Sequence, residues 1–199
     1  CAEKVADVCP LVIDLDFKYK DKHDTRQYTK DTVDEIIQLI FKVADTLFNL
    51  EPNQYDVWIF EKDNIRDCDK PDYESKDGIH MTFPKIKAHK TLYKLLVDKI
   101  LEDKELLNDI LLKTCENKPD NKIEDIVDSS IYQTNWLVYG SRKTGEESRY
   151  ELTRIISINS QKQISDIDID IYLQNPISII KNNSVYQTNV NTNYTEISQ

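Results

Sequence analysis

Two short stretches in which apolar and polar side chains mostly alternate constrain the fold of this chain most. The first is "PLVIDLDFKY", residues 10–19, and the second is "KDGIHMTFP", residues 76–84. Alternation with a period of two is typical of a β-strand with one buried face. In the first strand Asp14 and Asp16 fall on the polar face, with their α-carbons roughly 7 Å apart. In the second strand His80 faces away from Ile79 and Met81.

Other segments predict an α+β protein. A helix is expected from about Thr32, where Thr32 and Glu35 form a capping-box pattern before an apolar stripe of helical spacing. Residues 55–62 are expected to form a strand, and Pro84 is expected to end the strand that begins at Gly78. Two helices are predicted at about 89–102 and 104–115. Residues 123–128 lead to Asp128, and "WLVYG" and "YELTRIISI" predict two more strands around a polar turn.

Size and charge limit the kinds of protein this can be. The chain has 199 residues, of which 39% are hydrophobic and 31% charged, which suits one domain or two small lobes sharing a core. Its net charge of −10 argues against a nucleic-acid-binding protein, unless the basic groups gather on one face. It has no apolar run of about 18 residues. Because it begins at Cys1 without a signal-peptide pattern, we expect a piece of a longer, non-secreted protein.

Three features carry candidate chemistry, and each alone has an ordinary explanation. The pair Asp14 and Asp16 on a strand face is more often a solvated face than a metal site. A single strand histidine such as His80 is more often structural, bonded to a backbone carbonyl. An aspartate that ends a strand, such as Asp128, is usually a cap or turn residue. It is the ordered set that points to a specific function.

Taken together, the three stretches resemble the three-motif signature of the archaeo-eukaryotic primase superfamily. The similarity is to the primase domains of large-DNA-virus helicase–primases and to eukaryotic primase-polymerases. "CPLVIDLDFKY" matches the first motif in full. In "KDGIHMTFP" Gly78 replaces the usual serine of the second motif, and Lys76 stands four residues before the histidine. "IVDSSIYQTNWLVYGSRK" matches the third motif, with Tyr132, Asn135 and a following basic pair.

The resemblance implies a fold and an activity. The implied fold is α+β, a mixed sheet built from an N-terminal α/β unit and a unit like the RNA-recognition fold. Residues 1–175 would be the catalytic domain, and 176–199 a linker or tail toward a helicase region. The implied activity is a DNA primase or primase-polymerase that makes short primers on single-stranded DNA from nucleoside triphosphates. A viral protein of this kind would act in the host cytoplasm or nucleus, without a membrane, and this piece is expected to be monomeric.

The resemblance also implies a site, whose chemistry suits these residue types. Nucleotidyl transfer builds negative charge on attacking and leaving oxygens, and two divalent cations can clamp both. Mg²⁺ and Mn²⁺ prefer carboxylate oxygens, so the expected metal-binding and catalytic residues are Asp14, Asp16 and Asp128. The triphosphate needs donors as well. The expected nucleotide-binding residues are Lys76, Gly78, His80, Arg142 and Lys143.

Several alternatives remain open at the level of sequence. One is a non-catalytic remnant that binds template or a helicase, which the acidity and Gly78 favour. Another is a metal-dependent nuclease that uses the same carboxylates. Asp166, Asp168 and Asp170 imitate the first motif but are interpreted as a solvated strand face. Arg26 and Tyr28 are candidate contacts to template or nucleotide.

Overall fold

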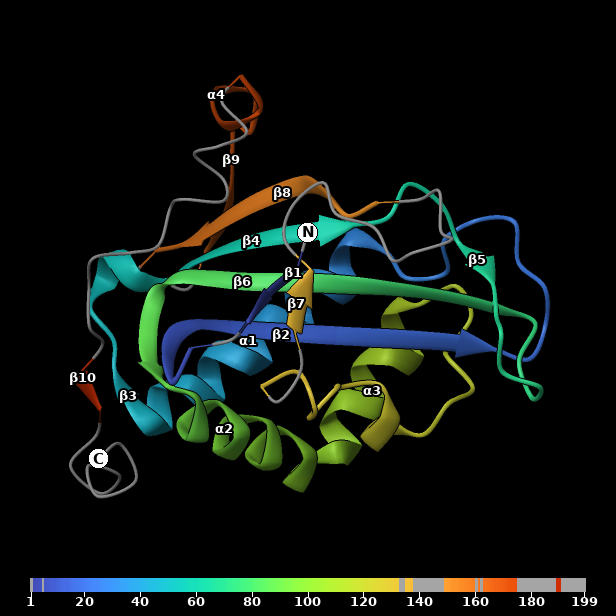
Figure 1. The fold of residues 1–199 in the computed structure, drawn as a ribbon, viewed down its shortest axis with the longest axis horizontal. Coiled ribbons are helices and arrows are strands. Elements are labelled where there is room, and N and C mark those ends of the chain that lie inside the picture. Colours follow the sequence, from blue (N-terminus) through green and yellow to red (C-terminus); the bar gives the residue numbers. More distant parts are fainter. Residues whose placement is uncertain are drawn as a thin grey trace.

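The computed structural model describes residues 2–4, 6–132, 135–137, 149–159, 161, 163–174 and 189–190. Its centre is a twisted sheet with the strand order β2-β6-β4-β8-β9 (Figure 1). These strands are β2 (Val8–Tyr19), β6 (Ser75–His89), β4 (Asp56–Glu61), β8 (Glu151–Ile158) and β9 (Ile164–Ile167), and β5 (Arg66–Asp67) pairs with β6. The pairs within this sheet are all antiparallel. The α+β class is confirmed, with an antiparallel sheet where a mixed one was expected.

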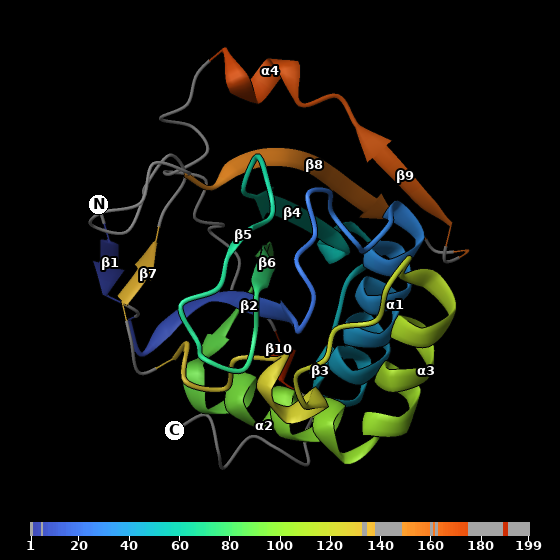
Figure 2. The same cartoon turned by 90° about the vertical axis from the view of Figure 1, so that its right-hand side faces the viewer.

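Three helices cover one face of the sheet (Figure 2). They are α1 (Lys30–Leu47), α2 (Lys90–Glu102) and α3 (Lys104–Thr114), so both of the later helices lie close to their predicted positions. The apolar side chains of β2, from Leu11 to Phe17, are buried against them together with Ile79, Met81 and Phe83 of β6. The alternation in β2 and β6 therefore separates a helix-covered face from a second face, called here the open face, which carries the polar residues of these two strands. Over β4 and β8 the same face carries a smaller buried apolar cluster that includes Trp58, Phe60 and Leu152.

Smaller elements surround this core. Strand β1 (Ala2–Lys4) pairs with β7 (Asn135–Leu137), and β3 (Phe48–Asn49) pairs with β10 (Asn189–Val190). Two short 3₁₀ helices (Pro52–Gln54 and Ile123–Asp125) and α4 (Asp170–Leu173) complete the structure. Both strands expected around the polar turn are present, β7 at the start of "WLVYG" and β8 over "YELTRIISI", and the turn itself lies outside the described residues. Most of 176–199 lies outside the described residues, so the proposed domain boundary stays a prediction.

Helix α1 begins earlier than predicted, because its cap is Thr29. Thr29 has an extended backbone (φ −107°, ψ 175°), its hydroxyl accepts from Thr32 N at 3.3 Å, and Thr32 Oγ1 accepts from Thr29 N at 3.0 Å. The predicted box of Thr32 and Glu35 is therefore wrong by one turn. The hydroxyl of Thr32 fills the role that Glu usually has in a capping box.

The prediction that Pro84 ends its strand is also wrong, since β6 runs to His89. The register between β2 and β6 shifts between Pro10 and Leu11, which face Lys87 and Phe83 respectively. Pro84 lies in this irregularity, and pairing with β4 stops at Thr82. At this position neither β2 nor β4 needs a hydrogen bond from the backbone N–H that proline lacks. A strand can contain proline at such an irregularity.

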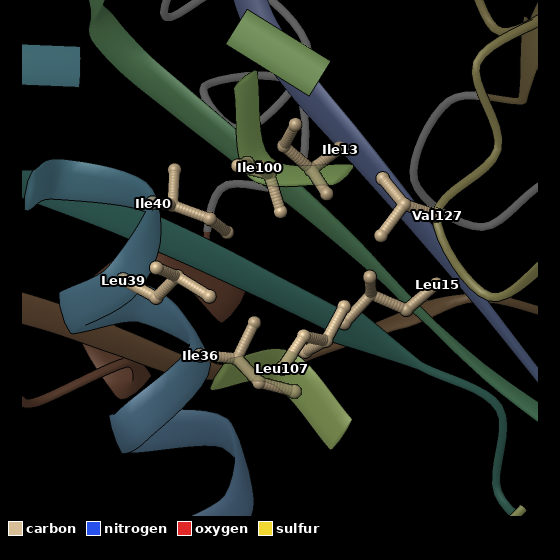
Figure 3. Close-up of a pocket in the computed structure, with 8 residues that line it drawn as sticks. All are labelled: Ile13, Leu15, Ile36, Leu39, Ile40, Ile100, Leu107 and Val127. Carbon is tan, nitrogen blue, oxygen red and sulfur yellow. The ribbon is translucent and has the colours of Figure 1, made fainter. Parts of the chain in front are cut away.

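A small apolar cavity lies directly behind the first motif, between β2 and the helices (Figure 3). Its wall on the sheet side is Ile13, Leu15 and Val127, and α1, α2 and α3 supply the other side. The side chains that flank Asp14 in sequence thus anchor the strand in the core. Among the described residues, no helix is long and apolar enough to cross a membrane.

Candidate functional site

The candidate residues of the first two motifs lie side by side on the open face of the sheet. In the register of β2 with β6, Asp14 faces His80 and Asp16 faces Gly78. Cross-strand neighbours project to the same side, so the four positions form a compact square. The distance from His80 Nε2 to Asp14 Oδ1 is 3.3 Å. The paired residues are at least 62 positions apart in the sequence, so it is the sheet register that brings them together.

Asp128 joins this square from the other edge of β2. Leu15 forms an antiparallel bridge with Val127, flanked by hydrogen bonds from Asp128 N to Asp14 O (3.0 Å) and from Asp16 N to Ile126 O (2.8 Å). Asp128 is thereby placed opposite Asp14. The Asp128 carboxylate accepts hydrogen bonds from Ser130 N at 2.8 Å and Ser130 Oγ at 2.7 Å, so it also has the turn-forming role of an aspartate after a strand.

Gly78 occupies a position with no room for a side chain. A Cβ placed there would lie 2.8 Å from the backbone oxygen of Leu15 and 3.5 Å from Asp16 Oδ1. The first distance is shorter than a van der Waals contact, and a backbone oxygen of a paired strand has little freedom to move. The glycine, in place of the usual serine, therefore allows β2 and β6 to lie this close together.

We expect Gly78→Ala to lower the free energy of unfolding by about 1–3 kcal/mol, the usual cost of overpacking, because β2 and β6 must separate locally. Gly78→Ser should be destabilised at least as much, since both substitutions add the same Cβ. Chemical denaturation of the two variants and the parent measures this. A Gly78→Ser protein as stable as the parent would contradict the close approach.

His80 is covered by two residues that the sequence did not single out. The ring of Tyr150 stacks on the His80 imidazole, with centroids 3.5 Å apart and planes inclined by 19°. Lys62 Nζ lies 5.1 Å from the centroid of the Tyr150 ring. All three side chains are buried, and Lys62 is only 2% exposed. His80 is therefore a buried histidine on the open face of the sheet, and not a member of the main core.

The predicted nucleotide-binding cations are only partly described. Lys76 lies on the same face of β6 as Gly78 and His80, where its Nζ forms an ion pair of 2.7 Å with Asp69 of the acidic loop before β6. This hydrogen bond lowers the pKa of Asp69. Arg142 and Lys143 lie outside the described residues, so their predicted role stays a prediction.

Asp14, Asp16 and Asp128 have the carboxylate side chains that bind hard cations, but among the described residues their arrangement does not form a complete metal site. Asp14 Oδ1 is buried with His80 Nε2 3.3 Å away, and Asp16 beside it is 48% exposed. Carboxylate oxygens of this kind are what Mg²⁺ and Mn²⁺ prefer. Yet no three His, Cys, Asp or Glu side chains within the described part of the chain are arranged to hold a metal ion. The three-carboxylate metal site therefore stays a prediction.

Arg26 and Tyr28 do not lie on the open face, contrary to the interpretation of them as template or nucleotide contacts. Arg26 Nε and Nη1 form ion pairs with Asp77 (3.0 Å) and Glu61 (2.9 Å), and the Tyr28 hydroxyl donates to Glu61 at 2.7 Å. Asp77 is on the helix-covered side of β6, with a fully buried side chain. These residues form a buried polar network behind the site.

The second acidic run also has a structural explanation. Asp166 on β9 pairs with Lys30 at 2.6 Å and with Arg154 at 2.7 Å. These hydrogen bonds, first of all that of Lys30, lower the pKa of Asp166. Asp168 and Asp170 are exposed, and Asp168 accepts a hydrogen bond from Asp170 N at 3.0 Å. All three aspartates are exposed, as expected, but Asp166 alone of them lies on a strand, where its ion pair with Lys30 joins β9 to α1.

Asn121 is a further residue that sequence reasoning missed. Its side chain accepts from Lys18 N at 3.0 Å and donates to Asp16 O at 2.9 Å and to Asp125 O at 3.2 Å. It imitates the backbone of a neighbouring strand and continues the pairing of β2 beyond the bridge at Val127. A single asparagine in a polar loop carries no sequence signal of this role.

Comparisons with known proteins found a matching family and related viral proteins. Residues 1–156 match the family model of the C962R protein N-terminal AEP domain, where AEP denotes archaeo-eukaryotic primase. The chain is 28% identical over 159 residues to the "Putative helicase L207/L206" of Acanthamoeba polyphaga mimivirus, an alignment that covers 76% of this chain and 15% of that protein.

A second relative, the "Putative helicase 184R" of Invertebrate iridescent virus 6, is 25% identical over 181 residues, which is 81% of this chain and 18% of that protein. The chain thus spans less than a fifth of the length of either curated relative. Because the family model covers more than three quarters of the sequence and all three motifs, the chain belongs to the archaeo-eukaryotic primase family, as a domain of the kind found at the N-terminus of the C962R protein.

Proposed function

We propose that this domain is the catalytic domain of a DNA primase or primase-polymerase. It would use a single-stranded DNA template and nucleoside triphosphates to make short primers by two-metal nucleotidyl transfer. The observation that carries the proposal is the convergence of three distant segments on one open sheet face. Asp14 is the centre of this convergence, with His80 opposite it on β6 and Asp128 opposite it on the other side.

The acidic residues would be the metal ligands. Asp14, Asp16 and Asp128 would hold two Mg²⁺ or Mn²⁺ ions, which supply charge neutralisation for the attacking and leaving oxygens. Asp14 and Asp16 project from one strand whose other face is anchored in the core, so their spacing is fixed by the backbone. Without cations, such neighbouring carboxylates repel one another.

The other residues suit a polyphosphate. Gly78 is not part of this set, because Leu15 O fills the position of its Cβ and its N–H donates to Asp77 Oδ1 at 2.8 Å. His80 and Lys76 lie on the same face of β6 and can donate to phosphate oxygens, with Arg142 and Lys143 as further expected donors. A triphosphate would compete with Asp69 for Lys76, and because Asp69 is 78% exposed this ion pair is weak.

The wider context is part of the proposal. The two curated relatives carry the word helicase in their names and are several times longer than this chain. We therefore expect a helicase region in the same polypeptide, and a place of action at viral replication sites in the host cytoplasm or nucleus.

The proposal is tested with the 199-residue chain, a single-stranded DNA template and labelled nucleoside triphosphates with Mg²⁺ or Mn²⁺. We expect the parent to make new oligonucleotides and Asp16→Asn to lose at least roughly 100-fold of that activity, because one metal-binding carboxylate is removed. Asp168→Asn is the matched control, since it changes an exposed aspartate of the second acidic run and should leave activity unchanged.

The other outcomes identify the alternatives. Degradation of the template that depends on Asp16 would indicate the nuclease, and template binding without synthesis or degradation would indicate a non-catalytic module. Mn²⁺ binding, followed by electron paramagnetic resonance, adds a measurement independent of activity. Equal Mn²⁺ affinity of the parent and Asp16→Asn would exclude the proposed metal site.

A further inference from the structure

Tyr150 lies where the second motif meets the rest of the open face. Its ring covers His80, and its hydroxyl oxygen lies 3.8 Å from the position that a Cβ on Gly78 would take. One aromatic ring thus extends along β6 from the histidine to the glycine of the same motif. Tyr150 is 6% exposed and His80 is 5% exposed, so the contact is a packed one.

The placement of Tyr150 depends on a bulge in β8. Ile59 of β4 faces Arg154, but the next residue, Phe60, faces Leu152, so Thr153 is the extra residue. Beyond the bulge, Glu61 faces Glu151, and the next position along puts Tyr150 opposite Lys62. This agrees with the contact between the Tyr150 ring and Lys62 Nζ.

Without the bulge the same strand would present a different chemistry. An uninterrupted register from Ile59 and Arg154 would put Glu151 opposite Lys62, and a carboxylate would then lie beside His80 in place of an aromatic ring. The side chain of Thr153 is bonded to Glu61, which holds the extra residue in place. Bulges are frequent next to active sites because they redirect a side chain in this way.

The stack restricts the orientation of the imidazole. An imidazole on an open sheet face can rotate about its Cβ–Cγ bond, but a ring stacked at 3.5 Å leaves only the orientation parallel to that ring. In this orientation Nε2 is directed along the sheet toward Asp14. Phe60 faces His80 from β4 and belongs to the same apolar cluster as Tyr150.

We propose that Tyr150, held by Lys62 and placed by the bulge at Thr153, is a positioning residue that fixes the His80 imidazole for binding of the nucleoside triphosphate. The identity of the ligand, a nucleoside triphosphate, rests on the proposed function. The fixed orientation of the imidazole does not depend on that function. Tyr150 contacts His80 and would not itself bind phosphate. Its effect should therefore appear in the orientation of His80 and in nucleotide affinity together.

The first measurement is the proton NMR spectrum of the His80 ring in the 199-residue chain. The sequence has only three histidines, so His→Gln variants assign their signals. A ring stacked on another is shifted upfield by the ring current. We expect Tyr150→Leu to move the His80 signals downfield, Tyr150→Phe to leave them in place, and His23 and His89 to be unaffected in both variants.

The second measurement is the KM for ATP and dATP in the primer assay. We expect Tyr150→Leu to raise KM roughly three- to tenfold, the size of one aromatic pair, with a smaller change in kcat, and Tyr150→Phe to restore the parent value. Tyr172→Leu is the matched control. Tyr172 also packs against the open face, with its ring 5.0 Å from that of Trp58, but away from His80.

Unchanged His80 signals in Tyr150→Leu would overturn the inference, and so would displaced signals with an unchanged KM in a folded variant. Equal KM increases in Tyr150→Leu and Tyr172→Leu would also overturn it, because they would indicate general loosening. Failure of the proposed function can be distinguished from failure of this inference, because in the former case the parent protein itself would make no primers.

Discussion

Arg26→Ala is expected to lower the free energy of unfolding by about 3 kcal/mol, the low end of the cost of breaking a buried ion pair. Arg26 pairs with Asp77 and Glu61 and also donates to Lys62 O at 2.6 Å. Its removal leaves the Asp77 carboxylate buried beneath the second motif without its cation. The low end applies because the Arg26 side chain keeps 28% exposure, which admits water to the gap.

Denaturant unfolding of three proteins measures this effect. Lys22→Ala is the matched control, because the ion pair of Lys22 with Asp67 is made by side chains that are 62% and 81% exposed, and its loss should cost less than about 1 kcal/mol. If Arg26→Ala were no more destabilised than Lys22→Ala, the network behind the site would be without energetic importance.

The effect should depend on pH in a defined direction. Burial raises the pKa of Asp77, and Arg26 partly opposes this. The folded protein therefore holds a proton on Asp77 more tightly than the unfolded chain, so this group favours folding at low pH and loses that contribution as the pH rises through its folded pKa. Without Arg26 the pKa of Asp77 rises further. The stability difference between Arg26→Ala and the parent should thus be smaller at pH 4 than at pH 7.

The parts of the fold that local patterns determine were predictable. The alternation around Asp14 and His80 correctly assigned two strands and the faces of their side chains, because a period of two follows from strand geometry alone. The apolar stripes likewise gave the later helices to within about a residue. The cap at Thr29 was missed because a Thr hydroxyl, which is not part of the usual pattern, completes the box.

The candidate site was predictable only as far as its motifs extend. That Asp14, Gly78, His80 and Asp128 gather on one face was inferred from a family resemblance, and the strand register agrees with it. Tyr150 was missed because its position depends on a one-residue bulge in β8, and no local pattern indicates such a shift. A register error of one residue would exchange Tyr150 for Glu151.

Charge alone misled the interpretation of Arg26. A cation after the first motif invites a role in binding phosphate, but its partners, Asp77 and Glu61, come from two other strands. For the same reason, the net charge of −10 is weaker evidence against nucleic-acid binding than the number alone implies. Part of the acidic excess is buried in this network, and Asp166 is paired with two cations.

Asn121→Ala should destabilise the protein by about 2–4 kcal/mol, because it leaves two backbone groups of β2 without partners in a site only 4% exposed. Asn121 bonds both Lys18 N and Asp16 O, so its loss frees the edge of β2, the strand that carries the two aspartates of the first motif. Asn117→Ala is the matched control. Asn117 is exposed and donates to Gln27 Oε1, and its loss should cost about 1 kcal/mol.

Hydrogen exchange locates the effect within the strand. In Asn121→Ala the Lys18 amide should exchange faster, whereas the Asp16 amide, bonded to Ile126 O, should stay protected. Asn121→Asp separates the two halves of the interaction. It keeps an acceptor for Lys18 N but directs a carboxylate at the carbonyl oxygens of Asp16 and Asp125. That repulsion favours the protonated acid, so Asn121→Asp should regain stability relative to the parent as the pH falls. Equal protection of Lys18 in all three proteins would show that Asn121 does not hold the edge of β2.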